Sequence, residues 1–356
     1  MDNWNKIFTN LIRTQRNTYW GNWTLMPTVG IGAIGILDEN TVNFTYLGTL
    51  ERYNPIHTQN NVAWKMTSEK VSQNQANVAL DGAFIDPETG EAVNAGIEAS
   101  WAFGNEESIA SNFSVTKQST LDDAAKTIKD QWQQIAALAQ ANGMGDGTNI
   151  SQGFCVVTTV TYASCGMNVG SMSKNSKFSI TGTAEGIAGM LGGGGEGSWF
   201  YTENSSGFNS ILWPAEAGKL AETDVPIAFM VASFDQTNLI PVWTTRLNFL
   251  QLRVSNKNGG TYIVDCDLTY NIPDVTQQQS KSQDVSGGRA YTFELPLNAT
   301  NLKLSLRFKR AIESKEKTFH LSWNNPLMEW MPSGSGRHTV ELYGVWPADP
   351  SIGAGE

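Results

Sequence analysis

Side chains that commonly carry out catalysis or bind metals are few and far apart in this chain. The three histidines, His57, His320 and His338, are widely separated, and none belongs to a set of residues at the spacing of a metal site or a catalytic triad. Acidic residues are scattered, and no two of them stand out as a glycosidase pair. We therefore expect no catalytic residues and no metal site, so an enzyme is the least supported interpretation.

Four consecutive glycines, Gly192 to Gly195, follow an apolar segment. The surrounding run GGGGEG lacks the Lys-Ser/Thr pair of a phosphate loop and the strand-then-helix setting of a dinucleotide site, so we expect no cofactor. Each ordered glycine costs about 0.5 to 1 kcal/mol relative to alanine inside a helix or strand. The run therefore indicates either a loop or a segment that changes shape.

The composition indicates a β-rich protein without a nucleic-acid partner. The net charge is −10, from 34 acidic and 24 basic residues, so no basic face is expected to attract DNA or RNA. Only 16% of residues are charged, while Asn, Ser, Thr, Gln and Gly occur in nearly every segment, as in sheet surfaces and turns.

Targeting signals and disulfides are not expected. No apolar stretch approaches the roughly 18 residues of a transmembrane helix, and the start MDNWNKIFTN lacks the pattern of a signal peptide. Cys155, Cys165 and Cys266 are an odd number, which excludes a complete disulfide framework. We expect synthesis and folding in a reducing cytoplasm.

Two arms with period-2 alternation, residues 74–84 and 93–103, flank a turn sequence at 86–90. The pattern predicts a β-hairpin, and each arm has the roughly 9 to 11 residues that cross a bilayer as a tilted strand. The predicted membrane-facing residues of this first hairpin are Ala76, Val78, Leu80, Gly82, Phe84, Val93, Ala95, Ile97, Ala99, Trp101 and Phe103.

A second alternating arm, residues 178–190, leads into the glycine run, which we expect to form the tip of a second hairpin. The return arm, 196–204, alternates poorly, because Phe200 lies on the opposite side from its aromatic neighbours. The predicted membrane-facing residues are Phe178, Ile180, Gly182, Ala184, Gly186, Ala188, Met190, Gly192, Gly193, Gly194, Gly195, Trp199 and Tyr201.

Alternation alone leaves two interpretations open. The arms could be half-buried strands of an ordinary twisted sheet. Their small apolar residues, and the predicted helix at 120–141 between the two hairpins, favour membrane insertion instead. Because only a closed barrel satisfies every backbone group in hydrocarbon, two hairpins per chain imply a ring of many copies.

An amphipathic basic helix is predicted over residues 4–16. It either covers a sheet as a terminal helix or lies on an anionic membrane as a lipid-binding helix. The residues assigned to lipid binding are Trp4, Lys6, Phe8, Leu11, Arg13 and Arg16.

Short strands at regular spacing, without helices between them, fill residues 245–350 and predict a β-sandwich. We therefore predict an α+β fold, with a twisted antiparallel sheet, flanking helices and two membrane-insertable hairpins, plus a C-terminal all-β sandwich. The expected domains are a pore-forming domain at 1–240, a membrane- or receptor-binding sandwich at 241–350 and a flexible tail at 351–356.

The order of these elements resembles the pore-forming domain of the gasdermins, and more broadly the membrane attack complex/perforin and cholesterol-dependent cytolysin group. The resemblance lies in WNKIFTNLIR followed by TLMPTVGIGAIGIL, in the first hairpin and the helix, and in FCVVTTVTYASCGMNV entering KFSITGTAEGIAGML. The stretch WPAEAG to VPIAFMVASFD is similar to the strand that closes the second hairpin in such domains.

The C-terminal part resembles the terminal β-sandwich of cholesterol-dependent cytolysins, through TYIVDCDLTYNI, GGRAYTFELPLNATNLKLSLRF, the region 323–326 and TVELYGVWP. Two departures matter. KRAIESKEKTFH stands where that family has a tryptophan-rich loop with a cysteine, and Val345-Trp346 replaces its threonine-leucine pair. Cholesterol recognition is therefore not carried over, and the charged run 309–317 is expected to be a solvated loop.

The resemblance implies a pore-forming protein that binds a membrane, assembles into a ring-shaped homo-oligomer and inserts two hairpins per subunit. A lipid, glycan or protein receptor is expected for the sandwich, and the target is the cell's own membrane or that of another cell after release. The alternative is an adhesin or lectin that stacks sugars on Trp213, Trp243, Trp323, Trp330 or Trp346.

Overall fold

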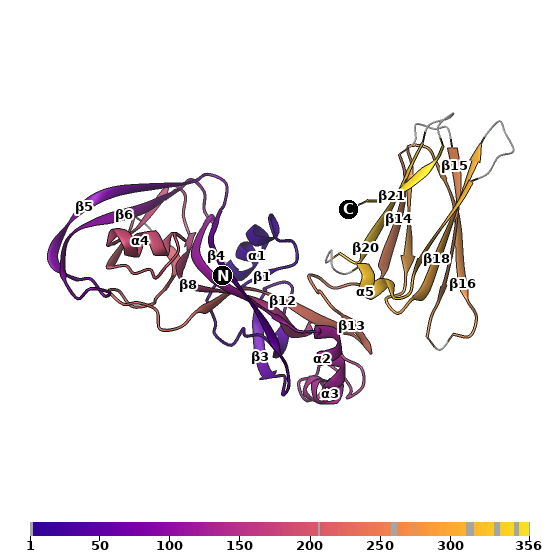
Figure 1. The fold of residues 1–356 in the computed structure, drawn as a ribbon, viewed down its shortest axis with the longest axis horizontal. Coiled ribbons are helices and arrows are strands. Elements are labelled where there is room, and N and C mark those ends of the chain that lie inside the picture. The colour runs from indigo at the N-terminus through magenta and orange to yellow at the C-terminus, as the bar shows by residue number, and fades with distance from the viewer. Residues whose placement is uncertain are drawn as a thin grey trace. The chain divides into compact units, whose positions relative to one another are not determined.

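The computed structural model describes residues 3–205, 207–257, 262–273, 275–310, 317–330, 335–344 and 349–355, without the side chains of 81–83, 310, 354 and 355. The chain divides into two compact units. The first comprises Met1–Asn142 and Gly153–Ala232, and the second comprises Gly143–Gln152 and Ser233–Glu356. Figure 1 shows the elements of both, which are described separately below.

A large twisted sheet forms the centre of the first unit. Its middle strand, β8 (Phe154–Ser171), is buried at nearly every position, because strands pair with it on both sides and helices cover its faces. The neighbours follow the order β1-β12-β8-β2-β3, with β11 and β7 also on β8, β4 on β7, and β13 on β12. Their bounds are β1 (Trp20–Gly21), β2 (Ala33–Leu37), β3 (Phe44–Thr49), β4 (Pro55–Thr67), β7 (Ile109–Leu121), β11 (Phe208–Trp213), β12 (Val225–Asp235) and β13 (Asn238–Ile240).

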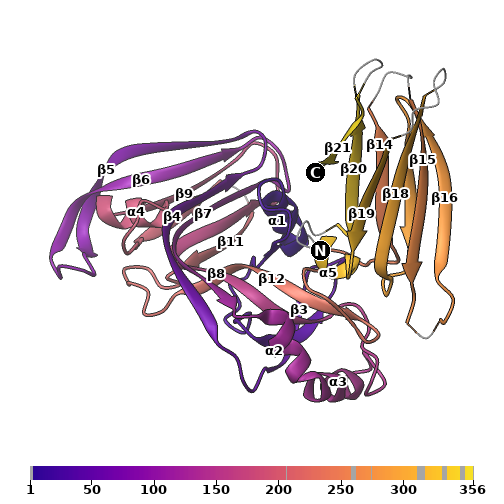
Figure 2. The same cartoon turned by 45° about the vertical axis from the view of Figure 1, so that its right-hand side comes forward.

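A smaller antiparallel sheet holds the predicted hairpins. Its strand order is β10-β9-β6-β5. The bounds are β5 (Val71–Ile85), β6 (Ala92–Phe103), β9 (Ser176–Gly182) and β10 (Tyr201–Asn204). Helix α4 (Ala184–Met190) packs between this sheet and strands β7 and β8, and the long strands β5 and β6 extend beyond it (Figure 2).

The predicted helix at 120–141 is shorter than expected and broken in two. Leu121 still belongs to β7, and the helices are α2 (Ala124–Asp130) and α3 (Trp132–Ala141). Gln131 interrupts them with φ −113° and ψ 17°. Its side-chain oxygen accepts hydrogen bonds from the backbone N–H groups of Glu51 (2.9 Å) and Arg52 (3.2 Å), and its amide donates to the carbonyl of Arg52 (2.6 Å). This tertiary contact fixes the break, which the apolar spacing did not reveal.

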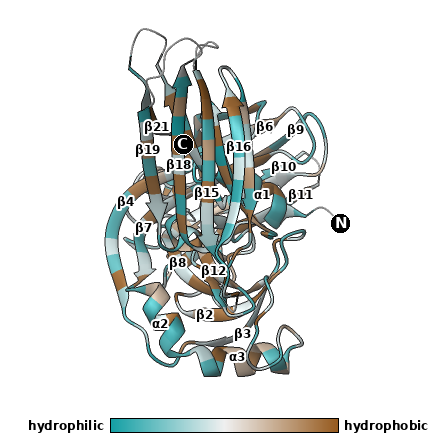
Figure 3. Ribbon diagram, turned by 90° about the vertical axis from the view of Figure 1, so that its right-hand side faces the viewer, coloured by the Kyte–Doolittle hydropathy of each residue, from teal (hydrophilic) through white to brown (hydrophobic). Residues whose placement is uncertain are grey.

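The second unit contains the predicted β-sandwich, made of two sheets with the strand orders β17-β14-β20-β21 and β16-β15-β18-β19. Figure 3 shows hydrophilic and hydrophobic residues alternating along β18, as a strand with one buried face requires. The bounds are β14 (Leu250–Asn256), β15 (Tyr262–Asn271), β16 (Gln279–Ser286), β17 (Ala290–Leu295), β18 (Thr300–Arg310), β19 (Lys317–Trp323), α5 (Pro326–Trp330), β20 (Arg337–Tyr343) and β21 (Ser351–Gly355). The predicted α+β fold class is confirmed.

The expected flexible tail at 351–356 is wrong for most of its length. Residues 351–355 form β21, which pairs with β20 in antiparallel register from Tyr343↔Ser351 to Thr339↔Gly355. The sequence SIGAG has no alternation of large apolar residues, so its pairing depends on backbone hydrogen bonds to an edge that only the folded sandwich provides.

Candidate membrane-insertion region

The first predicted hairpin is present as β5 and β6. The two strands pair from Val71↔Phe103 to Ala79↔Ala95, and, after a register shift, at Phe84↔Val93. The connection is a tight turn, because the Asp86 carboxylate accepts hydrogen bonds from the backbone N–H groups of Glu88 (2.8 Å) and Thr89 (3.1 Å).

Burial along this hairpin differs between its two strands, because β5 is the edge strand and β6 lies between β5 and β9. Ala99, Trp101 and Phe103 near the base are at most 1% exposed, since they pack against strands β7 and β8. Ala76 and Val78 lie opposite Glu98 and Gly96, so these two predicted membrane-facing residues are on the other face of the hairpin from Ala99. Ala76 is exposed, and so is Ala95 nearer the tip. Leu80 is buried, Val78, Phe84, Val93 and Ile97 are partly buried, and Gly82 lies among the residues whose side chains are not described. The base of β6 is thus anchored in the fold, whereas β5 is exposed from Ser72 to Asn77, and the predicted membrane-facing residues of the two strands do not all share one face.

The strand predicted over 178–190 ends at Gly182, and residues 184–190 form helix α4 instead. The Thr183 hydroxyl caps this helix by accepting a hydrogen bond from the N–H of Gly186 (3.0 Å). Ile187, Met190 and Leu191, at helical spacing, are buried in the same cluster as Trp101 and Phe178. The period-2 pattern and the helical pattern coexist in this segment, and tertiary packing selects the helix.

Phe178, Ile180 and Gly182 remain in β9, and all three are buried. In α4 the other predicted positions no longer share a face, because Gly186 and Met190 are buried whereas Ala184 and Ala188 are exposed.

Glycines permit the close packing of α4 against the chain that returns from it. A methyl carbon built on Gly189 would lie 2.4 Å from the carbonyl oxygen of Glu196, and one on Gly186 would lie 2.5 Å from the Ser198 hydroxyl. Only glycine fits at either position without movement of the neighbouring chain.

The four-glycine run forms the loop after α4 rather than a hairpin tip. Gly192, with φ +80°, would carry a Cβ 2.8 Å from the carbonyl oxygen of Phe113, and a Cβ on Gly193 would lie 2.7 Å from that of Ala188. Gly194 and Gly195 have φ of +86° and +83° and open space around them. The first two glycines are therefore required by close packing, and the last two by backbone conformation alone.

The return chain places Phe200 on the apolar side and Tyr201 on the polar side, while Trp199 packs against the core cluster of Trp101 and Phe178. β10 pairs with β9 through Tyr201↔Thr181, so Tyr201 shares the side of the polar β9 residues. Phe200 is buried and stacks on Phe84 with ring centroids 4.8 Å apart, and its N–H donates to the carbonyl of Thr181 (2.7 Å). Trp199 is partly buried and donates from Nε1 to the carbonyl of Pro214 (2.9 Å). The pairing of β9 with β10 was the missing signal, since the weak alternation of 196–204 could not set the register.

Two polar contacts border the region. Lys177 near the start of β9 pairs with Glu98 in the middle of β6 at 3.2 Å. Burial raises the pKa of the Cys165 thiol to about 11, so this side chain beside the glycine loop stays protonated and unreactive near neutral pH.

Helix α1 (Trp4–Arg13) covers the central sheet in this structure. Trp4 and Phe8 are buried in a core cluster, Leu11 packs against it, and Lys6 is exposed. Arg13 lies 4.1 Å from the ring centre of Trp20, and burial lowers its pKa to about 10. Arg16, beyond the helix, lies 4.9 Å from the ring centre of Trp64. Lipid binding by the apolar face would require the helix to detach, and it stays a prediction.

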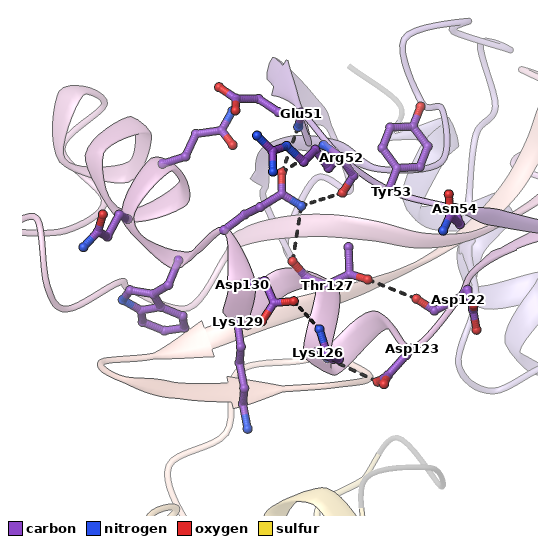
Figure 4. A pocket seen from close by; sticks show the side chains of 14 residues that line it. Glu51, Arg52, Tyr53, Asn54, Asp122, Asp123, Lys126, Thr127, Lys129 and Asp130 are labelled. Carbon is purple, nitrogen blue, oxygen red and sulfur yellow. Dashed lines mark hydrogen bonds and ion pairs between the residues drawn. The ribbon is translucent and has the colours of Figure 1, made fainter.

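A hollow of about 1050 Å³ lies where residues 51–54 meet α2 and α3 (Figure 4). Its polar groups bond mainly to one another, through the contacts of Gln131 and a pair between Lys126 and Asp130. No set of side chains converges on a ligand here. Within the described residues there is no group of three or more potential metal ligands.

No helix in the described part of the chain is both long and apolar enough to cross a bilayer. Two segments depart from the cholesterol-dependent cytolysin pattern, and the structure does not describe most of either one. They are the pair Val345 and Trp346 and the run 309–317.

No protein-family model matches the chain, and no curated protein matches it. Among solved structures, it is similar to cholesterol-dependent cytolysins. The cytotoxin suilysin from Streptococcus suis is 9% identical, with 95% of this chain and 88% of that chain covered and a TM-score of 0.23. A non-hemolytic pneumolysin from Streptococcus pneumoniae is 11% identical, with 95% and 87% covered and a TM-score of 0.23.

A disulfide-locked mutant of intermedilysin, solved with human CD59, is 9% identical, with 81% of this chain and 67% of that chain covered and a TM-score of 0.21. TM-scores this low do not establish a detailed common fold. None of these three structures is a gasdermin, and the resemblance to gasdermins stays a prediction.

Proposed function

We propose that this chain is a non-enzymatic pore-forming protein that assembles into a ring on a membrane and inserts two β-hairpins per subunit into a shared barrel. One observation carries the proposal. It is the strand register of the small sheet, which, if continued through α4, would convert residues 176–204 into a second hairpin that ends level with the first.

The continuation follows from the observed pairs. β6 and β9 pair one for one up to Ile97↔Gly182. Extending β9 without a shift would place Ala184 opposite Ala95 and Gly186 opposite Val93. The pairs between β9 and β10 would, extended in the same way, close the second hairpin around Leu191. Leu191 would then lie opposite Glu88, which is in the turn of the first hairpin.

The length and the apolar face of the extended strand also agree with a membrane-spanning hairpin. A strand from Ser176 to Met190 would equal the 15 residues of β5, more than the roughly 9 to 11 needed to cross a bilayer. Its apolar face would run continuously from Phe178 to Met190 through the small residues at 182, 184, 186 and 188. The seven-residue α4 is short enough to depend on its packing, because isolated helices of that length are not stable in water.

The central sheet has an exposed edge strand that could pair with a neighbouring subunit in a ring. Within the described residues, β4 pairs with β7 on one side, and the first nine residues of β4 are exposed or partly buried on both faces, with Ile56 and Val62 at 54% and 41% exposed. β11 occupies the other flank, on β8. Unpaired strand edges associate readily, and closing a barrel of hairpins requires pairing between subunits.

The remaining assignments follow the same proposal. The sandwich would contact a lipid, glycan or protein receptor, and the chain would act at its own cell's membrane or at a target membrane after synthesis in the cytoplasm. No observation favours the lectin alternative, since Trp243 and Trp330 are 1% and 3% exposed, and Trp323 packs on Trp330 and His338. Trp213 is partly buried and donates from Nε1 to the carbonyl of Thr223 (3.0 Å), and Trp346 is not described.

Dye release from liposomes tests the function. We expect leakage from vesicles of suitable composition, and rings in micrographs of the treated vesicles. A chain that releases no dye from neutral, anionic or receptor-bearing vesicles, with or without prior proteolysis, would refute the proposal.

Engineered cysteines test the register. Glu91→Cys with Ala188→Cys should cross-link on vesicles more than in solution, because the extended register places these two exposed residues opposite each other. The control is Glu91→Cys with Glu185→Cys, three positions out of register. Equal cross-linking of both pairs would contradict the proposed second hairpin.

A further inference from the structure

The neighbouring strands β4, β7 and β8 of the central sheet change register at adjacent positions. β4 has Asn60 and Asn61 unpaired, β7 has Thr116 bulged, and β8 has Ser164 bulged. The bulges face one another across the sheet, because the flanking pairs are Val62↔Val115 and Val115↔Ala163. Bulges bend a strand and increase its twist, and β4 follows a wide arc in Figure 2. We name these aligned positions the bulge line.

Residues 221–224, which precede β12, bond to the bulge line through Asp224. The Thr116 hydroxyl donates to Asp224 Oδ2 (2.9 Å), and Lys117 Nζ lies 3.2 Å from the same oxygen. The side chains of Lys117 and Asp224 are 34% and 24% exposed. Because both are partly withdrawn from water, this pair is screened less than an ordinary surface ion pair.

The four-glycine loop also bonds to the bulge line, through Gly195. The Ser164 hydroxyl donates to the carbonyl of Gly195 (3.2 Å), and Cys165 Sγ lies 3.8 Å from the same oxygen. A cavity of about 490 Å³ lies between the Asp224 contacts and the Gly195 contacts. It is lined by Tyr162, Ser164, Glu196, Gly197 and residues 221–224. The loop after α4 and the segment before β12 therefore meet the sheet at the same bend.

We propose that Asp224, through its contacts with Thr116 and Lys117 at the bulge line, restrains release of the glycine loop and of α4. We call these two contacts the clasp. This inference rests on the proposed pore-forming function for its consequence, but the clasp itself is a property of the protein in solution. The second hairpin can form only if residues 184–198 leave the sheet. Ser164, the β8 residue that donates to the carbonyl of Gly195, is a bulge, and the matching bulge on β7 is bonded to Asp224. Loss of the Asp224 contacts frees the bend and lowers the barrier to release.

Hydrogen exchange of the full chain in solution tests the clasp without a membrane. Asp224→Ala removes both contacts, and Thr116→Val removes only the hydroxyl. We expect backbone exchange at 115–117 and 192–198 to rise about tenfold in Asp224→Ala and less in Thr116→Val, because Thr116→Val leaves the ion pair between Lys117 and Asp224 in place. Glu222→Ala is the matched control, because it removes a carboxylate from the same cavity but from an exposed side chain.

The outcomes are separable. Unchanged exchange at 192–198 in both Asp224→Ala and Thr116→Val, or an equal rise in Glu222→Ala, overturns the clasp. If Asp224→Ala does not fold, Thr116→Val decides. Leakage from vesicles should accelerate by a similar factor in Asp224→Ala. Faster exchange in a protein that never causes leakage, wild type included, supports the clasp and refutes the proposed function instead.

Discussion

The sandwich and the small sheet use the same alternating pattern with different side chains. Inside the sandwich, long aliphatic residues such as Leu252, Leu304 and Leu306 are at most 1% exposed. Around α4, close packing depends on Gly186 and Gly189, where an added methyl carbon would collide with the returning chain. Large side chains stabilise one packed arrangement, because much apolar area is buried per residue. Glycines and alanines bury less area and fit a helix, a loop or a strand, which suits a segment that converts between them.

Truncating a large buried side chain should have the largest effect and should separate the two regions. Leu306→Ala and Ile187→Ala should each cost about 2 to 5 kcal/mol of local stability, as lost burial plus a cavity. We expect Leu306→Ala to loosen the sandwich without accelerating leakage, and Ile187→Ala to accelerate it by releasing α4. Hydrogen exchange on each unit and dye release measure the two effects. Acceleration in both variants would remove the distinction between the regions.

Adding a methyl group to α4 should have the next effect. Gly189→Ala should destabilise the docked helix by about 1 to 3 kcal/mol through overpacking against Glu196, and should expose residues 184–198 to proteolysis. Ala188→Ser, at an exposed position of the same helix, is the control. Equal protease resistance of wild type and Gly189→Ala would contradict tight packing at this glycine.

The glycine run should divide into two halves. Gly192→Ala and Gly193→Ala should destabilise the soluble form, because each Cβ meets a carbonyl oxygen. Gly194→Ala and Gly195→Ala should each cost only about 1 to 2 kcal/mol, since their positive φ is unfavourable but the space is open. Thermal unfolding of the four single variants checks this order. Gly90→Ala, another positive-φ glycine in open space, is the comparison.

The smallest effect should be a pH dependence confined to the sandwich. Burial lowers the pKa of His338 below its usual 6.5, although nearby Glu329 opposes the shift, and the ring stacks on Trp330. The folded state then binds fewer protons than the unfolded state, so stability should be full above about pH 6.5 and fall below it. His338→Gln should flatten this dependence in denaturation measured from pH 7.5 to 5. An identical slope in both proteins would contradict the role of His338.

Much of the fold followed from the sequence because alternation reports which face of a strand is buried. It predicted the β5–β6 hairpin and most sandwich strands, including β15 and β18. It missed β21, which relies on backbone pairing and was expected to be a flexible tail, and β16, with the sequence QSKSQDVS, shows no alternation of large apolar residues that would locate it. These strands exist because neighbouring edges are available, which is a property of the assembled sheet.

The candidate region was predicted less completely. The residues of 178–190 fit both a strand and a helix, so the local pattern could not choose between them. Tyr201 was assigned to the apolar side, but its pairing with Thr181 places it beside the polar residues of β9, and Phe200 is the buried residue. The bulge line could not be predicted either, since it joins Asn60, Thr116 and Ser164 across three strands.

The sequence by itself determined the β-rich class, the first hairpin and the unusual glycine content between two apolar segments, because these depend on residue type and local period. Only the tertiary structure decided that 184–190 is a helix, that two of the four glycines are required by packing, and that Asp224 reaches Thr116. Those outcomes depend on contacts between segments far apart in the chain, and a local pattern carries no record of such contacts.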